Sequence, residues 1–253
     1  MPHKLFVPFL DRPLVTKVTT VLNKGERNVE LLAEALQILV EDLDQFCLWL
    51  KDLREDKTLM TEITQRSYWH PNGFAKLVLH ESDEKEQDQF LIRLHVWPAT
   101  QGDHLGESNP HSHRWDFAST ILLGEGMSTT EFTECDNCGS PYNRYRYGTV
   151  STDKAALKND GQPVMLTGIP SLVIKRGQIY QCDTSVAHTV QPLGSDLTAT
   201  IILRGPHRSS STTVYRKPEL STDQPNRPIS EDEVREILDE VITGIGPLRK
   251  STP

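Results

Sequence analysis

The stretch QFLIRLHVW, residues 89–97, decides the fold because it alternates between two kinds of side chain. In an extended strand, successive side chains point to opposite faces, so every second residue shares a face. One face would carry only apolar residues, namely Phe90, Ile92, Leu94 and Val96. The other would carry Arg93 and His95 together with Leu91 and Trp97. We therefore predict a strand whose second face turns toward something polar, either solvent or a cavity.

Stretches of the same kind continue on both sides of this strand. GFAKLVLHE, residues 73–81, precedes it across the acidic turn SDEKEQD. Further short strands are predicted downstream in WDFASTILLG, STTEFTE, YNRYRYGTV, PVMLTG, SLVIKRG, the segment around His188 and LTATIILRG. Turn-forming residues separate them at intervals of about 8 to 15 residues, with no helical pattern in between. This order predicts a mainly β domain, an antiparallel sandwich or barrel.

The two ends of the chain carry helical patterns instead. Apolar residues recur at spacings of three and four over residues 28–54, which predicts one amphipathic helix or two helices with a break. The apolar stripe would either pack on the same chain, which we favour, or form the seam of a coiled-coil dimer. Ser230 followed by Glu233 is a capping-box signal for a short terminal helix over residues 230–242. We expect the Pro- and Ser-rich residues 209–228 to form a surface excursion.

We divide the 253 residues into a helical segment (1–72), a barrel (73–208) and a C-terminal extension with a helix (209–253). The net charge of −8 and the lack of a Lys/Arg-rich block argue against a nucleic-acid partner. No run approaches the roughly 20 apolar residues of a membrane span, and no signal-type apolar core begins the chain. Four cysteines in so long a chain do not suggest a disulfide scaffold. This composition is typical of a cytoplasmic globular protein.

Potential metal ligands are concentrated in HLGESNPHSHRWDF. His111 and His113 are two residues apart, so on a strand both imidazoles point the same way and can reach one point. A third histidine, His188, follows a turn in RGQIYQCDTSVAHTV. The H-x-H pair alone is common, and it leaves a metal site and a structural role equally open.

Together the two segments resemble the motifs of the cupins. The first cupin motif, H-x-H followed usually by Glu and then Gly, is matched by His111, His113 and Gly124. The second motif, G-x5-P-x-G-x2-H, is matched in spacing by Gly177, Asp183, Ser185 and His188, with Asp for Pro and Ser for Gly. The resemblance covers residues 74–205. It implies an antiparallel β-barrel of the double-stranded β-helix type, with a metal bound by His111, His113 and His188.

Phe117 occupies the position of the usual cupin Glu. Neighbouring Asp116 would point away from the histidines by strand alternation, unless a bulge intervenes. Among cupins, a three-histidine set without Glu most resembles the thiol dioxygenases of the cysteine dioxygenase type. That resemblance implies Fe(II), which binds substrate and O2 together, although imidazoles also suit Zn(II), Ni(II) and Cu(II). Three protein ligands leave coordination positions open, as in a catalytic site.

The same resemblance implies that an Arg on an early strand grips a substrate carboxylate, and Arg93 is the matching residue. Arg204 is a second candidate for binding an anionic group. It stands in TATIILRGP, near the place of the Tyr in a Ser-His-Tyr series that this strand lacks. Phe117 also stands where a crosslinked Cys would be. We therefore expect that free cysteine is not the substrate.

Weaker candidates surround these residues. His95 shares the face of Arg93 and is either a base that contacts the metal ligands or a core histidine. Tyr180 would donate a hydrogen bond to a bound oxygen species. His104 and Glu107 are either extra ligands, partners of the ligands or loop residues. The pair Cys135 and Cys138 is half a zinc site, a redox pair or two loop thiols.

These features predict a metal-dependent enzyme, foremost a mononuclear non-haem iron oxygenase that acts with O2 on a small polar or anionic metabolite. Two alternatives stay open: a non-catalytic module that holds Zn or a ligand, and a hydrolase or isomerase with a divalent metal as Lewis acid. The expected partners are a small-molecule substrate and O2, without nucleic acid or membrane. A homodimer through the helical segment is also left open.

Overall fold

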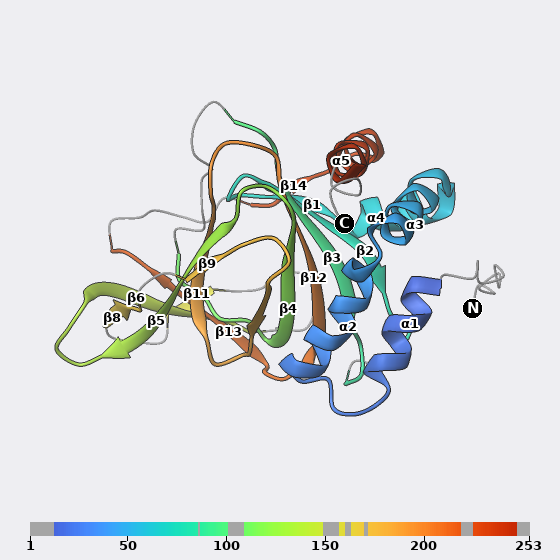
Figure 1. Ribbon diagram of the computed structural model, residues 1–253. Helices are drawn as coiled ribbons and strands as arrows, with labels where there is room; N and C mark the ends of the chain where they lie inside the picture. Colours follow the sequence, from blue (N-terminus) through green and yellow to red (C-terminus); the bar gives the residue numbers. More distant parts are fainter. Residues whose placement is uncertain are drawn as a thin grey trace, which may run out of the picture.

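The described strands of the computed structural model form two antiparallel sheets (Figure 1). The structure describes residues 13–85, 87–100, 109–148, 157–159, 163–169, 172–218 and 225–246. Sheet A has the order β10 (Ile179–Cys182), β4 (Trp115–Leu123), β12 (Thr198–His207), β3 (Leu91–Trp97), β2 (Phe74–Glu81), β1 (Tyr68–His70) and β14 (Arg227–Pro228). Sheet B has the order β11 (Ala187–Pro192), β5 (Met127–Cys135), β8 (Val164–Gly168), β6 (Ser140–Gly148) and β13 (Ser211–Arg216), with β7 (Leu157–Asn159) beside β6 and β9 (Leu172–Ile174) beside β5.

The mainly β, antiparallel fold class predicted from the sequence is confirmed. The described strand pairings do not close the two sheets into one barrel, so the architecture is a β-sandwich with helices at both ends of the chain. Strand β3 has the predicted alternation: its even-numbered apolar residues are buried, and Arg93 and His95 point to the other face.

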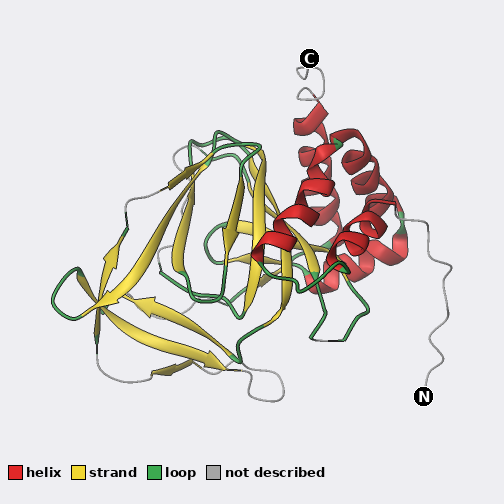
Figure 2. Ribbon diagram, turned by 60° about the horizontal axis from the view of Figure 1, so that its bottom comes forward, coloured by secondary structure: helices red, strands yellow, loops and turns green. Residues whose placement is uncertain are grey.

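The helices lie together on one side of the strands (Figure 2). They are α1 (Pro13–Leu22), α2 (Val29–Glu41), α3 (Leu43–Glu55), α4 (Lys57–Arg66) and α5 (Glu231–Ile245). Helix α2 packs on β4, β10 and β12, α4 packs on β2, and α5 packs on β4. The main hydrophobic core therefore lies between the helices and one face of sheet A, which we call the outer face. The opposite, inner face of sheet A lies toward the metal-ligand candidates.

The apolar stripe of residues 28–54 is buried in this core. Leu36 and Leu50 have no exposed surface. The stripe is divided between α2 and α3 at Asp42, whose carboxylate accepts hydrogen bonds from two backbone amides of α3 at 3.1 and 3.0 Å. Such an N-cap satisfies amides that have no partner inside the helix. The prediction of helices that pack on their own chain is confirmed, in its two-helix form.

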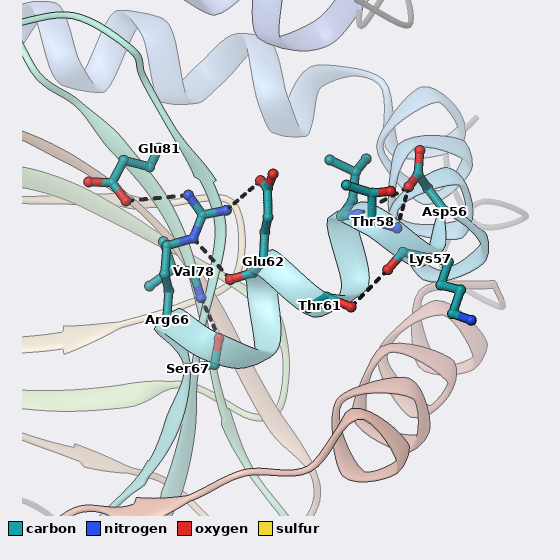
Figure 3. Close-up of polar contacts among 10 residues, drawn as sticks. Asp56, Lys57, Thr58, Thr61, Glu62, Arg66, Ser67, Val78 and Glu81 are labelled. Carbon is teal, nitrogen blue, oxygen red and sulfur yellow. Dashed lines mark hydrogen bonds and ion pairs between the residues drawn. The ribbon is translucent and has the colours of Figure 1, made fainter. Parts of the chain in front are cut away.

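Helix α4 is tied to sheet A at its C-terminal end (Figure 3). Arg66 pairs with Glu81 of β2 at 3.3 Å. The hydroxyl of Ser67 accepts a hydrogen bond from the backbone amide of Val78, also in β2, at 3.0 Å. At the other end of the helix, the carboxylate of Asp56 accepts from two amides of the first turn. After the C-terminal end of α4, the chain continues directly into β1, a strand that the sequence did not predict.

The predicted capping box begins α5. The hydroxyl of Ser230 accepts from the amide of Glu233 at 3.2 Å, and the Glu233 carboxylate accepts from the amide of Ser230 at 2.8 Å. This hydrogen bond, supported by Arg227, lowers the pKa of Glu233 to about 2. Glu233 also accepts from the indole N–H of Trp69 at 3.0 Å, so the cap joins α5 to β1. The terminal helix is confirmed.

One segment differs from expectation. Part of the predicted surface excursion, residues 211–216, is the strand β13, which pairs with β6. Tyr215 is buried, and its backbone amide donates to the carbonyl of Pro110 at 2.8 Å. The sequence of this segment resembles a polar loop, because the strand that pairs with it comes from a distant part of the sequence.

The domain limits at residues 73 and 208 stay predictions, and strands β1 and β14 extend sheet A from outside them. None of the helices in the described ranges is both long enough and apolar enough to cross a membrane.

Candidate metal centre

The H-x-H segment lies between β11 and β13. The backbone amide of His111 donates to the carbonyl of His188 at 3.0 Å, and the amide of His188 donates back to His111 at 3.0 Å. On the other side, the amide of Ser112 donates to the carbonyl of Thr213 at 2.9 Å. This double pairing places His111 beside His188, although the two residues are far apart in the sequence.

Three histidines converge at this point. One ring nitrogen from each of His111, His113 and His188 lies within 4.8 Å of the other two. The Nε2 atoms of His113 and His188 are 3.4 Å apart. Nδ1 of His111 lies 3.1 Å from the carbonyl oxygen of Asn109, which accepts only, so Nδ1 carries the proton and Nε2 is left for the cluster. The structure thus brings the predicted ligand set together.

Cys182 orients the third of these rings. Its sulfur lies 3.2 Å from Nδ1 of His188 and 3.6 Å from the carbonyl of Asp183. Both contacts are satisfied when Nδ1–H donates to the sulfur and the thiol donates to the carbonyl, which leaves the lone pair on Nε2 of His188. Burial raises the pKa of the Cys182 thiol to about 12, so the thiol keeps its proton at neutral pH.

Two of the three rings, those of His113 and His188, are held in the neutral form that a metal ion requires. Burial, with a smaller effect from His111, lowers the pKa of His188 to about 3. Burial and the two neighbouring rings also hold the pKa of His113 well below its ordinary value. Three imidazole nitrogens are a donor set that fits Fe(II), Zn(II), Ni(II) or Cu(II), and this donor set does not choose among the four metals.

Phe117 and Asp116 lie as strand alternation predicted. The ring of Phe117 stands 5.1 Å from that of His113 and 5.9 Å from that of His188, measured between ring centres. Asp116 accepts a hydrogen bond from the amide of Thr184 at 3.2 Å and pairs with a distant Arg side chain. Burial raises the pKa of Asp116. Within the described part of the chain, no carboxylate joins the three-histidine cluster.

A cavity of about 250 Å³ lies beside the three histidines. Side chains from the inner face of sheet A and from sheet B line it. No acidic residue is among the described residues that line the cavity, whereas Lys76 and Arg93 each bring a positive charge to it. A bound divalent ion would add to this charge, so the cavity favours an anionic ligand.

Arg93 lies inside the cavity. Its guanidinium carbon stands 5.1 Å from the ring centre of Trp115. Its Nε atom is buried and has no hydrogen-bond partner among the described residues. Burial lowers the pKa of Arg93, with Tyr68 and Glu81 acting in the opposite direction. A buried guanidinium is costly unless an anion accompanies it, and a ligand anion would supply this partner.

His95 and Tyr180 also line the cavity. The ring of His95 packs 4.9 Å from that of Phe74, and burial holds its pKa well below the ordinary value. The hydroxyl of Tyr180 is buried without a hydrogen-bond partner in the described chain, and its ring stands 5.9 Å from that of His188. Burial raises the pKa of Tyr180, so its phenol is protonated at neutral pH and can donate to a ligand.

Arg204 is not among the described residues that line the cavity. Its guanidinium carbon stands 4.7 Å from the ring centre of Trp115, and the guanidinium bonds to His207 and to Gln89. Its predicted contact with substrate therefore stays a prediction.

Sequence reasoning missed His70, Lys76 and Trp115, which also line the cavity. His70 stacks on Phe74 with the ring centres 4.6 Å apart, and Nζ of Lys76 stands 5.3 Å from the ring centre of Tyr68. A signal existed for Lys76, because it is a single charge within the apolar run FAKLVL and shares the face of Phe74. His70 carried no such signal, since β1 is only three residues long.

The remaining candidates lie elsewhere. Cys135 and Cys138 form a disulfide between the end of β5 and the turn that leads to β6. His104 and Glu107 fall outside the described residues.

No protein-family model and no curated protein matches this chain. Among solved structures, it is similar to the cupin domain of CENP-C from Drosophila melanogaster, with 9% identity over 55% of this chain and 74% of that one, at a TM-score of 0.30. An RmlC-like cupin from Shewanella frigidimarina matches with 12% identity over 56% and 85% of the two chains, at 0.29. A cupin superfamily protein from Desulfitobacterium hafniense matches with 12% identity over 53% and 79%, at 0.28. At these TM-scores the likeness assigns neither a metal nor an activity to this chain.

Proposed function

We propose that this protein is a mononuclear non-haem iron oxygenase that acts with O2 on a small anionic metabolite. The observation that carries the proposal is the position of the three histidines, His111, His113 and His188, at the wall of a small cavity. None of the described residues that line this cavity is acidic. When bound, Fe(II) supplies a centre at which substrate and O2 coordinate together and exchange electrons. Three protein ligands leave positions open for both.

The other cavity residues bind and orient the substrate. Arg93 offers a fork of N–H donors that matches a carboxylate, and its buried Nε has no hydrogen-bond partner among the described residues. Tyr180 offers a protonated hydroxyl near His188. Apolar rings such as those of Phe74 and Phe117 form much of the remaining wall and limit the access of water.

The three-histidine set resembles that of the cysteine dioxygenase type, but two departures argue against free cysteine as substrate. Phe117, not Cys, packs beside the rings of His113 and His188. In the pairing of β12 with β4, Arg204 stands opposite Phe117, close to where that type has its Tyr. We therefore propose a different anionic substrate in a related pocket.

Metal analysis of protein purified without oxygen tests the proposal. We expect one iron per chain, and we expect replacement of His111, His113 or His188 by Ala to remove it in each case. His80→Gln is the matched control, because His80 lies on β2 outside the cluster and the variant should keep its metal. Metal retained at full occupancy in the His188→Ala variant would contradict the site itself.

The choice of iron and O2 is tested separately. Iron-loaded protein, incubated with a panel of short carboxylates in an oxygen electrode, should consume O2 with at least one of them, and the His188→Ala variant should not. Stoichiometric zinc together with no O2 uptake would instead support the binding-module or Lewis-acid alternatives.

A further inference from the structure

We infer that the cavity binds a monocarboxylic acid with an apolar tail. The acid group lies at Arg93, and the tail extends away from the metal ligands along an apolar wall. This inference rests on the proposed function, because it names the substrate class of the same site. The sequence alone predicts only that the substrate is small and polar or anionic.

The acid group belongs to the end of the cavity where the histidines lie. The guanidinium carbon of Arg93 stands 5.1 Å from the ring centre of Trp115, and the ring centre of His113 stands 5.6 Å from that of Trp115. Trp115 begins β4, directly after the H-x-H segment. A carboxylate bound by Arg93 would therefore lie near the metal ligands.

Arg93 is the side chain to which we assign the acid group. Its Nε is buried and has no hydrogen-bond partner among the described residues, so a ligand oxygen would satisfy it. Nζ of Lys76, which also lines the cavity, already lies 5.3 Å from the ring centre of Tyr68. The site therefore requires one acid group and not two.

An apolar wall begins beyond the histidines on sheet A. The ring of Phe117 marks the level of the metal ligands, because its centre stands 5.1 Å from that of His113. Ile121 lies four residues further along β4 and also lines the cavity, which places it about 13 Å beyond Phe117 at the rise of a strand. Ile121 is buried.

Sheet B continues this wall at the same distance from the histidines. On β11, Val190 follows His188 by two residues and lines the cavity. Pro192, two residues further, stands opposite Met127 of β5, which in turn stands opposite Ile174 of β9. Met127 and Ile174 are buried and line the cavity as well. The apolar wall consists of Ile121, Met127, Ile174 and Val190.

The apolar wall suits a hydrocarbon. Its side chains carry no polar atom besides the sulfur of Met127. His95, whose Nε2 is buried without a partner in the described chain, stands level with Ile121 but two strands away, since Thr200 of β12 pairs with both. Apolar cavities stay dry and take up apolar ligands. A tail that starts at a carboxylate on Arg93 is therefore stabilised by each carbon that reaches the wall.

A series of aliphatic acids tests the inference. Isothermal titration calorimetry should compare butyrate, hexanoate and adipate at one ionic strength, with the full chain in metal-free and zinc-loaded forms. We expect the affinity to rise about fourfold for each methylene between butyrate and hexanoate, the effect of moving a methylene out of water. Adipate should bind more weakly than hexanoate, because its second carboxylate would have to leave water for the apolar wall.

Variants separate the acid group from the tail. Ile174→Phe fills space at the apolar wall and should abolish the preference for hexanoate, with butyrate binding unchanged. Ile174→Ala enlarges the same space and should move the preference toward octanoate, which guards against a folding defect in the Phe variant. Val173→Phe adds a ring on the exposed side of β9 and is the matched control, since Val173 is 45% exposed. Arg93→Gln should weaken butyrate and hexanoate by the same factor.

Equal affinities for butyrate and hexanoate in the parent would overturn the inference, as would adipate that binds as tightly as hexanoate. Ile174 variants that keep the chain-length preference of the parent would also overturn it, and so would a parent that binds none of these acids. The proposed function fails separately. A chain that binds no metal but prefers hexanoate loses the oxygenase proposal and keeps the tail site, whereas an iron-loaded chain that consumes O2 without any chain-length preference does the reverse.

Discussion

The outer and inner faces of sheet A differ completely, although the same strands form both. On the outer face, Leu77, Leu94 and Ile201 stand opposite one another in β2, β3 and β12 and have no exposed surface. One residue earlier or later along each strand, the inner face carries Lys76, His95 and Thr200 in the same register. A step of one residue thus separates a layer that stabilises the fold from a layer that lines the cavity.

The apolar outer face allows this fold to tolerate a charged cavity on the inner face. The outer face and the helices bury a continuous apolar cluster, which includes residues from α1 to α5. The inner face shares only a smaller cluster around Phe117 and Ile121. Because the apolar area buried beneath the helices supplies most of the stabilisation, unpartnered polar atoms on the inner face can be retained for function.

The largest effect should come from adjacent residues on β12. Ile201→Ala, on the outer face, should lower the free energy of unfolding by about 2–5 kcal/mol, because it leaves a cavity in a packed core. Ile202→Ala, on the inner face, should cost about 1 kcal/mol, because that half-buried side chain already borders the ligand cavity. Urea unfolding of both variants measures the difference. Equal losses of unfolding free energy in the two variants would show that the outer and inner faces contribute equally to stability.

Smaller effects are expected when either of the two buried free cysteines is replaced by Ala. Cys182→Ala should weaken zinc binding by about tenfold, because Nδ1 of His188 loses the contact that fixes the ring. Cys47→Ala, buried in α3 on the helical side, should change stability and not metal affinity. Competition with a chelating dye measures both. Unchanged zinc affinity in Cys182→Ala would mean that the surrounding rings, not the thiol, hold His188 in place.

The smallest effect on stability at neutral pH should come from replacing His70, because its ring carries no charge at that pH. Burial lowers its pKa from 6.5 in the ordinary case to about 4 in the fold. Between these values the unfolded chain binds a proton that the folded chain does not, so stability is lost as the pH falls from 6.5 toward 4. Metal-free His70→Phe should lose less stability than the parent between neutral and mildly acidic pH, as measured by urea unfolding. The same pH dependence in both proteins would place the responsible proton uptake on other histidines.

The sequence by itself determined the elements whose signals are local. Alternation over residues 89–97 predicted both faces of β3, and the spacing of three and four predicted the helices that cover the outer face. The pair Ser230 and Glu233 marked the start of α5. His111, His113 and His188 were found because two motifs with fixed spacing lie within single segments. These features depend on residues close in the chain, where backbone geometry fixes the side-chain direction.

Only the tertiary structure decided which residues of distant segments pack against these faces. The placement of β13 beside the H-x-H segment, the contact of Cys182 with His188 and the approach of His70 and Lys76 to the cavity all join residues that are distant in sequence. The same local pattern permits many pairings, and the pairing that forms is the one that buries the outer face under the helices while satisfying the backbone hydrogen bonds. In the sequence, Lys76 is a single charge within an apolar strand. Only the register with β3 places it on the same face as Arg93 and next to it.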